Sequence, residues 1–254
     1  MLKLMDDARA EGIDVICDQY PYNFGSTLLS ALLPPKYLAE GSEKLIMKLL
    51  EPEIRRNIIK DLENDESYEN FMKLLGPENV LIIACSLTTE FNGKFLDKIG
   101  KEMGVEPGEA AAELLVKNKG MVLMGTRSCD EDVVEEIWRH PFTAAGSDGI
   151  GAGTGMPTHP RTYGTFPRIF ETIVRERAVT SLEEAVRKCT FLPANFLGLK
   201  TKGLVKEGYD ADLVIFDKNK IGTKASFANP ICSPEGIEYV FVKGNMIVKN
   251  GKIV

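Results

Sequence analysis

The stretch Thr143-Ala144-Ala145-Gly146-Ser147-Asp148-Gly149 is a small apolar run that ends in a carboxylate followed by glycine. The apolar residues predict a short buried strand, and Ser147-Asp148-Gly149 predicts the turn after it. In an α/β barrel the active site lies at the carboxyl ends of the strands. Asp148 is therefore a candidate catalytic residue, although an aspartate in a turn can also simply hydrogen bond its own backbone.

Further short apolar runs lie on both sides of this stretch and alternate with helical patterns. Strands are predicted over 14–17, 80–84 and 121–124, and helices before Gly12 and over 36–79, 94–103, 108–118, 131–139, 166–177 and 181–188. Strands that alternate with helices indicate an α/β fold with parallel strands. With an aspartate at a strand end, the pattern favours the closing part of a TIM-like (β/α)8 barrel.

The predicted secondary structure changes near residue 201, from alternating strands and helices to short strands. Short strand patterns over 211–217, 237–242, 246–248 and 252–254 follow one another, separated by turn signals such as Asn250-Gly251. They predict a small β-domain. We therefore expect a partial barrel over 1–200, with a helical insertion around 36–79, and a β-domain over 201–254.

Composition narrows the class of protein. The 254 residues carry a net charge of −6, which argues against binding to nucleic acid or to an anionic membrane. The five cysteines form no CxxC pair, as expected for reduced thiols in a cytoplasmic protein. No apolar run is long enough to span a membrane, and no signal peptide is expected. The chain opens inside a helix that leads to a strand, so Met1 is expected to be a fragment boundary.

Histidine is scarce, and this limits metal chemistry. His140 and His159 are the two histidines of the chain. A catalytic zinc ion usually needs three protein ligands and an open position for water. His140 stands beside Pro141 at the end of a predicted helix and is interpreted as structural. On these grounds the chain alone is not expected to be an active metallohydrolase.

Two further segments carry polar groups that could meet a substrate. Residues 18–27 run from Asp18 to Thr27 directly after a predicted strand and include Tyr20 and Ser26. Residues 159–168 include Arg161, whose planar guanidinium suits a carboxylate. The simpler interpretations are aromatic packing for the first segment and ion pairs with nearby acidic residues for the second.

Taken together and in this order, the three segments resemble a known family. Asp18-Gln19-Tyr20-Pro21-Tyr22 with Ser26-Thr27, then Ser147-Asp148-Gly149, then His159-Pro160-Arg161 with Tyr163-Gly164-Thr165-Phe166-Pro167-Arg168 are similar to the hallmarks of the D-aminoacylases, or N-acyl-D-amino-acid deacylases, of the amidohydrolase superfamily. The segment Gly208-Tyr209-Asp210-Ala211-Asp212-Leu213-Val214 also matches, although many amidohydrolases share it. The resemblance spans essentially the whole chain.

The resemblance implies hydrolysis of the amide bond of N-acyl-D-amino acids with zinc as cofactor. It places Asp148 as the residue that transfers protons, and Tyr20, Ser26 and Arg161 as ligands of the substrate carboxylate. It also implies that the metal ligands lie upstream of residue 1 and that the β-domain is the C-terminal part of a β-sandwich. The apolar run Leu28-Leu29-Ser30-Ala31-Leu32-Leu33 suggests a neutral or hydrophobic substrate side chain, unless these leucines face a core.

Three alternatives stay open at this point. The chain is expected to be the C-terminal portion of such a deacylase, as a truncated gene product or as one piece of a split enzyme. It could instead be a hydantoinase-like or dihydroorotase-like hydrolase, against which the run over 159–168 argues. The third alternative is an inactive remnant that binds a small carboxylate or a partner chain, and the partner would be the missing N-terminal half or a second copy.

Overall fold

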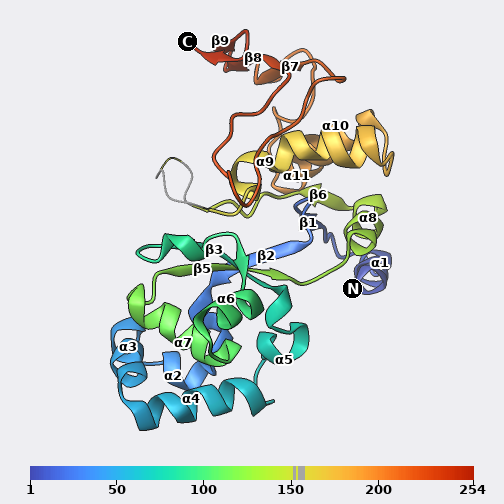
Figure 1. Cartoon of the computed structure of the whole chain (residues 1–254). Helices are drawn as coiled ribbons and strands as arrows, with labels where there is room; N and C mark the ends of the chain where they lie inside the picture. Colours follow the sequence, from blue (N-terminus) through green and yellow to red (C-terminus); the bar gives the residue numbers. More distant parts are fainter. Residues whose placement is uncertain (151–152, 154–157) are drawn as a thin grey trace. The chain divides into compact units, whose positions relative to one another are not determined.

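The computed structural model describes residues 1–150, 153 and 158–254, and the chain forms two compact units (Figure 1). The terminal unit contains both ends of the chain and comprises Met1–Tyr22, Asp130–Met156 and Pro160–Val254. The inserted unit comprises Asn23–Cys129 and Pro157–His159. Each unit has its own buried residues and its own sheet structure.

The terminal unit begins with a helix and a pair of short parallel strands. α1 (Leu2–Ala10) leads to β1 (Cys17–Gln19), which pairs in parallel with β6 (Thr143–Ala145). Parallel strands need a crossover, and α8 (Glu131–Arg139), which directly precedes β6, supplies a helix for it. β1, α8 and β6 thus form a βαβ arrangement, and the inserted unit lies in the sequence between β1 and α8.

The helix before Gly12 and the helix over 131–139 are confirmed, but the strand predicted over 14–17 is placed wrongly. It begins only at Cys17, and residues 14–16 lie outside any strand. Asp14 is exposed and its carboxylate pairs with Arg9 at 2.8 Å. This exposed charge explains why the strand begins later than the apolar run suggested.

A group of helices follows β6. They are α9 (Arg161–Arg168), the π-helix η4 (Ile169–Glu176), α10 (Leu182–Cys189) and α11 (Phe191–Phe196). The Ser181 hydroxyl accepts a hydrogen bond from the backbone N–H of Glu184 at 3.1 Å and caps α10. The helix start predicted from the sequence at Ser181 is therefore confirmed.

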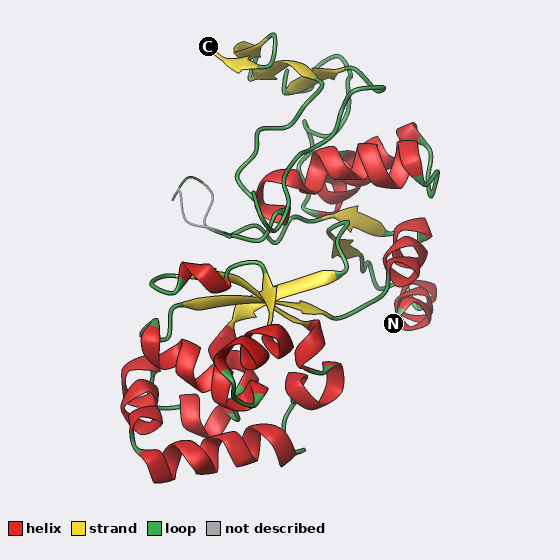
Figure 2. Cartoon of the chain, in the orientation of Figure 1, coloured by secondary structure: helices red, strands yellow, loops and turns green. Residues whose placement is uncertain are grey.

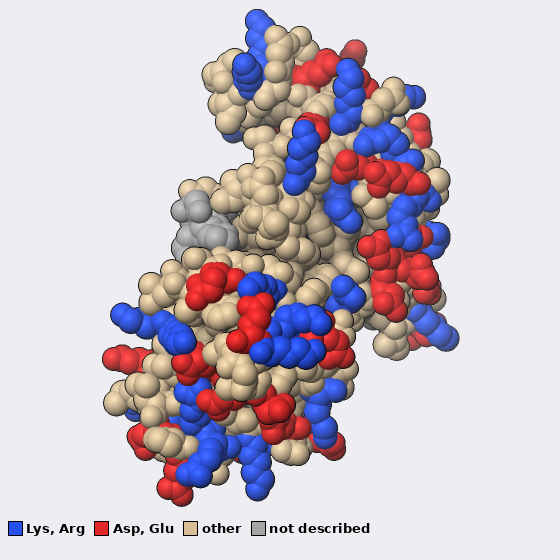
Figure 3. Space-filling view, viewed as in Figure 1, with Lys and Arg blue, Asp and Glu red and all other residues tan. Residues whose placement is uncertain are grey.

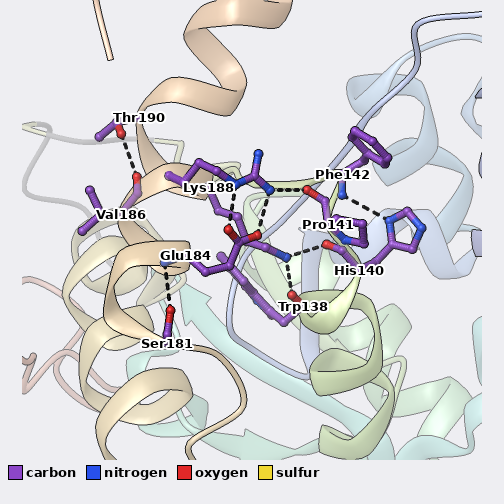
Figure 4. Close-up of polar contacts among 10 residues, drawn as sticks. Trp138, His140, Pro141, Phe142, Ser181, Glu184, Val186, Lys188 and Thr190 are labelled. Atoms are coloured by element: carbon purple, nitrogen blue, oxygen red, sulfur yellow. Dashed lines mark hydrogen bonds and ion pairs between the residues drawn. The ribbon is translucent and has the colours of Figure 1, made fainter. Parts of the chain in front are cut away.

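α10 is fastened to the carboxyl end of α8 by two basic side chains (Figure 4). Lys188 is fully buried and its ammonium donates to the backbone carbonyls of Trp138 and, at 2.5 Å, of His140. Arg187 donates to the carbonyl of Pro141 and pairs with Glu184 at 2.7 Å. These donors satisfy carbonyls that the last turn of a helix leaves without an intrahelical partner. Burial lowers the pKa of Lys188 to about 8.

The chain ends in a four-stranded antiparallel sheet with the order β10-β9-β8-β7. Its strands are β7 (Leu213–Phe216), β8 (Ile237–Val242), β9 (Asn245–Lys249) and β10 (Lys252–Ile253). Asn250 and Gly251 have φ angles of 50° and 74° and join β9 to β10. Positive φ at both positions is the geometry that Asn-Gly favours in tight hairpins, so the predicted turn is confirmed.

The inserted unit contains a four-stranded antiparallel sheet with the order β2-β5-β3-β4. Its strands are β2 (Phe24–Leu28), β3 (Val80–Cys85), β4 (Lys94–Phe95) and β5 (Val122–Arg127). Its helices are η1 (Leu29–Leu32), α2 (Pro35–Leu38), α3 (Ser42–Leu50), α4 (Pro52–Asn64), α5 (Phe71–Leu75), η2 (Pro77–Asn79), η3 (Thr89–Phe91), α6 (Leu96–Met103) and α7 (Pro107–Lys117).

Helices α3, α4, α6 and α7 lie on one side of this sheet (Figure 2). Between them lies one large apolar cluster, which includes Leu49, Ile58, Ile82, Leu114 and Met124. Pro107 begins α7, as the sequence predicted. The alternation of apolar and polar faces on these helices explains why they pack against the sheet.

The prediction that the strands near 80–84 and 121–124 are parallel is wrong. β3 and β5 are present, but they pair antiparallel, with Val80 opposite Thr126 and Ile82 opposite Met124. A continuous apolar run indicates a strand buried on both faces, and it carries no information about direction. The mixed α/β character is confirmed, whereas the partial TIM-like barrel, the β-sandwich and the boundary near residue 201 stay predictions.

Acidic and basic side chains are interspersed over the face of the molecule in view (Figure 3). Many of them form surface ion pairs, for example Lys36 with Asp61 at 2.8 Å and Lys94 with Glu102 at 2.7 Å. Among the described residues, no helix combines the length and the apolar character that a membrane crossing requires.

Candidate functional site

The candidate site begins where β1 and β6 end. Because the two strands are parallel, their carboxyl ends lie side by side, and Tyr20 follows β1 while Gly146 follows β6. The backbone N–H of Gly146 donates to the carbonyl of Gln19 at 3.1 Å and extends the pairing by one residue. Asp148 lies two residues farther along.

Asp18 fixes the identity of residue 146. A Cβ at Gly146 would collide with a carboxylate oxygen of Asp18, so any larger residue would displace one of the two strand ends. The sequence interpretation gave Asp18 no role, although it is the first residue of the segment Asp18-Gln19-Tyr20-Pro21-Tyr22. Its position in that motif was the signal that could have found it.

Asp148 is held by one arginine through two contacts. Arg161 Nη2 lies 2.6 Å from Asp148 Oδ2, and Arg161 Nε donates to the backbone carbonyl of Asp148 at 3.0 Å. The Arg161 side chain is 4% exposed and the Asp148 side chain 60% exposed. Asp148 also has a left-handed φ of 43°. The guanidinium thus fixes both the side chain and the main chain of a carboxylate that faces solvent.

The turn after β6 lies close to the start of α9. A Cβ at Gly149 would approach Thr162 Cα to 3.0 Å, which is tighter than most contacts of real Cβ atoms. Thr162 Oγ1 donates to the carbonyl of Ile150 at 3.3 Å, and Ser147 Oγ accepts from the N–H of Gly149 at the same distance. Glycine at 149 therefore allows the turn to contact the helix that carries Arg161.

Tyr20 completes this group. The guanidinium carbon of Arg161 lies 4.6 Å from the centre of the Tyr20 ring, a cation–π distance. Tyr20, Asp148 and Arg161, three of the four site residues predicted from the sequence, are thus brought together. The fourth, Ser26, lies in β2 of the inserted unit, half-buried and opposite Gly125.

A second arginine of α9, Arg168, makes similar contacts with residues that follow β1. Arg168 lies 4.8 Å from the centre of the Tyr22 ring, and its Nε donates to the carbonyl of Pro21 at 2.9 Å. Burial raises the pKa of the Tyr22 hydroxyl to about 12. A Cβ at Gly164 would lie 2.5 Å from that hydroxyl, so α9 packs directly on Tyr22. These contacts are those of a packing residue, the simpler interpretation of the aromatic run.

The apolar run after Ser26 mostly faces the core of the inserted unit. Leu29, Leu32 and Leu33 are buried in its apolar cluster, whereas Leu28 is 43% exposed. The sequence offered two interpretations of these leucines, a substrate pocket or a core. For three of them the structure favours the core.

The residues described here do not form a metal site. His140 Nε2 lies 2.9 Å from Asp6 Oδ1, and its Nδ1 accepts from the N–H of Phe142 at 3.3 Å, in agreement with the predicted structural role. His159 is buried. Over residues 1–150, 153 and 158–254, no three His, Cys, Asp or Glu side chains gather as ligands would. The side chains present therefore do not fit a catalytic zinc ion by themselves.

Comparison with known proteins agrees with the motifs. The profile of the amidohydrolase family matches residues 55–248. An N-acyl-D-aspartate deacylase of Alcaligenes xylosoxydans is 37% identical over 158 residues, which are 62% of this chain and 30% of that protein. A D-aminoacylase of the same organism is 34% identical over 164 residues, 65% of this chain and 32% of that protein.

A solved structure is similar over nearly the whole chain. It is an N-acyl-D-glutamate deacylase of Bordetella bronchiseptica in complex with zinc and a phosphonate inhibitor that mimics the tetrahedral intermediate. The TM-score is 0.71 at 27% identity, and the match covers 97% of this chain and 42% of that one. The chain thus spans less than half the length of the proteins it resembles.

Proposed function

This chain belongs to the amidohydrolase family, and we propose that it takes part in the hydrolysis of the amide bond of N-acyl-D-amino acids. The observation that carries the proposal is the pairing of a solvent-facing Asp148 with a buried Arg161 at the end of a parallel strand. The names of the related proteins support the substrate class, since all three are N-acyl-D-amino-acid deacylases or D-aminoacylases.

The proposed chemistry is general acid–base catalysis by Asp148. A water molecule adds to the acyl carbon, and the carboxylate of Asp148 accepts its proton. The same proton then passes to the amide nitrogen as the carbon–nitrogen bond breaks, which releases a carboxylic acid and the free D-amino acid. A proton carrier must be both accessible and well directed, and the 60% exposed, doubly held Asp148 meets both requirements.

We further propose that Tyr20 and Ser26 bind the α-carboxylate of the substrate through their hydroxyl groups; the resemblance implied Arg161 as a third ligand of this carboxylate. Tyr20 lies against the buried Arg161 guanidinium, and this cation supports the assignment of an anion-binding role. The predicted preference for neutral or hydrophobic side chains now has the support of Leu28 alone. A panel of substrates decides this point.

A metal cofactor is part of the proposal, but no step is assigned to it here. The related glutamate deacylase binds zinc, whereas the described residues of this chain do not fit a zinc ion by themselves. We propose that the ligands are supplied by residues outside this sequence, in keeping with the resemblance. The five scattered cysteines, which form no CxxC pair in the sequence, support the proposal of a cytoplasmic location.

The terminal sheet supports the proposal of a partner, either a further segment or a second copy. Val214, Ile215, Met246, Ile247 and Ile253 are exposed apolar side chains on its strands. Exposed apolar groups on an open sheet favour association. Sedimentation of the chain as a monomer at micromolar concentration would contradict the second-copy alternative.

The proposed activity is tested in the natural full-length polypeptide loaded with zinc. The substrates are the N-acetyl derivatives of D-leucine, D-aspartate and D-glutamate, their L-enantiomers, and hydantoin for the cyclic-amide alternative. Asp148→Asn is expected to lower kcat by about 10²–10⁴-fold. Asp14→Asn, which alters an exposed aspartate paired only with Arg9 in the described structure, is the matched control and should retain activity. Failure of the unmodified protein to hydrolyse any D-substrate would refute the function.

A further inference from the structure

We propose that Arg161 is a positioning residue, one that acts on the reaction through Asp148. This inference rests on the proposed function, because it assumes that Asp148 transfers the proton. The sequence assigned Arg161 to the substrate carboxylate instead. The two roles predict different kinetics, so they can be separated by experiment.

Arg161 contacts both the side chain and the backbone of Asp148. The Nη2 contact of 2.6 Å sets the direction of the carboxylate, and the Nε contact of 3.0 Å sets the orientation of the peptide carbonyl. Both donors belong to one rigid planar group, so the carboxylate and the backbone cannot move independently of each other. Asp148 has a φ of 43°, a backbone conformation that residues other than glycine rarely adopt, and this double contact holds it there.

Burial explains why this ion pair is expected to persist. Transfer of a guanidinium from water to the protein interior is costly unless it is paired and hydrogen bonded. Arg161 is 4% exposed, and its guanidinium contacts the carboxylate and the backbone carbonyl of Asp148 and the ring of Tyr20. Loss of the Asp148 carboxylate would leave a buried cation with a weaker set of partners. The buried Arg161 guanidinium therefore fixes the Asp148 carboxylate, which is itself exposed to solvent.

The surrounding turn reinforces the arrangement. Gly149 lies directly against Thr162, the residue next to Arg161, and Thr162 in turn bonds the carbonyl of Ile150. Two consecutive residues of the turn therefore contact two consecutive residues of α9: Asp148 contacts Arg161, and Gly149 lies against Thr162. A shift of α9 would move the carboxylate with it, and a displacement of about 1 Å at a catalytic group can cost about 100-fold in rate.

Arg168 offers a matched control on the same helix. It also stacks on a tyrosine and donates through Nε to a backbone carbonyl, but that carbonyl belongs to Pro21 and not to Asp148. Arg161→Met and Arg168→Met remove the same group from similar surroundings. Only the first variant removes the contact to the proposed base.

The experiment uses the natural full-length polypeptide with zinc and two substrates, N-acetyl-D-leucine and its carboxamide, which lacks the α-carboxylate. For Arg161→Met we expect kcat to fall about 10–100-fold for both substrates, with KM changed less than about threefold. Arg161→Lys should restore part of kcat, because it keeps the charge but loses the fork. Hydrogen exchange of the peptide over 146–150 should accelerate in Arg161→Met and not in Arg168→Met.

Two results would overturn the inference. If Arg161→Met raises KM for N-acetyl-D-leucine and leaves the carboxamide unaffected, Arg161 binds the substrate directly, and the deacylase function still stands. If exchange over 146–150 is unchanged in Arg161→Met, the arginine does not hold the turn. The exchange measurement needs no turnover, so it decides whether Arg161 holds the turn even if the unmodified protein hydrolyses none of the substrates and the proposed function fails.

Discussion

The two units differ in the lengths of their strands and in the kinds of residue that they bury. The inserted unit contains six-residue strands and one large apolar cluster, with most of its charged groups in surface ion pairs. The terminal unit pairs two strands of only three residues, and it buries two cations, Arg161 and Lys188. The comparison indicates that most of the apolar stabilisation lies in one unit, whereas the proposed chemistry is concentrated at the ends of two three-residue strands in the other.

The largest effect on stability is expected from Ile82→Ala. Ile82 is fully buried in β3, and removal of such a side chain costs about 2–5 kcal/mol of the free energy of unfolding. Trp138 of α8 is the one tryptophan of the chain, so its fluorescence reports on the terminal unit. We expect faster hydrogen exchange in β3 and β5, with little change in the denaturation midpoint seen by Trp138.

The conservative variant Ile82→Val provides the control, with an expected cost of about 0.5–1.5 kcal/mol. If the Trp138 midpoint moves as far as the exchange in β3, the two units unfold as one. The contrast between them would then describe composition and not independent stability.

A smaller effect is expected from Lys188, and it depends on pH. Burial lowers the pKa of Lys188 from 10.5 to about 8 in the folded chain. Between pH 8 and 10.5 the unfolded chain therefore binds more protons, so the free energy of unfolding contributed by this group rises with pH, by about 3 kcal/mol in all. Below pH 8 the ammonium is charged in both states and this gain is absent.

The measurement is the difference in unfolding free energy between the unmodified chain and Lys188→Met, followed by Trp138 fluorescence from pH 7 to 10.5. Cys189 and Tyr22, whose pKa values burial raises to about 12, titrate in the same range in the unfolded chain, and the difference cancels their contributions. Lys3→Met, at an exposed position of α1, is the control. A difference that stays flat with pH would show that the buried lysine keeps its ordinary pKa.

The smallest effect is expected from Ser181→Ala. The Ser181 hydroxyl caps α10, and loss of such a cap costs about 1 kcal/mol. Because α10 fastens the end of α8, the Trp138 midpoint should fall slightly, whereas exchange in β3 should not change. Ser181→Asp retains an acceptor and should recover most of the loss. An equal loss in both variants would argue against capping as the cause.

Local signals in the sequence predicted local structure well. Ser181 with Glu184, Pro107 at the start of α7 and Asn250-Gly251 each act within a few residues, because caps and turns depend on nearby atoms. The existence of β3 and β5 was also predicted, but their direction was wrong. Strand direction depends on which distant segment completes the sheet, and an apolar run does not record it.

The sequence indicated which residues lie together in the candidate site, but it did not indicate how they contact one another. The family motifs placed Tyr20, Asp148 and Arg161 together, and the structure groups all three. The two contacts between Arg161 and Asp148 could not be predicted, because they depend on the close approach of α9 to the turn at Gly149. Leu29, Leu32 and Leu33 show the same limit, since an apolar run does not indicate whether it faces a ligand or a core.

The pairing of β2 with β5 has a consequence for how such proteins diversify. These are the first and last strands of the inserted unit, and Phe24 lies directly opposite Arg127, so the chain enters and leaves the unit within roughly 5 Å. Because its two ends are adjacent, the inserted unit is a self-contained insertion in the chain. Recombination could exchange it for a shorter or longer one while the strand before it and the helix after it keep their connection, which offers evolution a route to new specificities on an old catalytic frame.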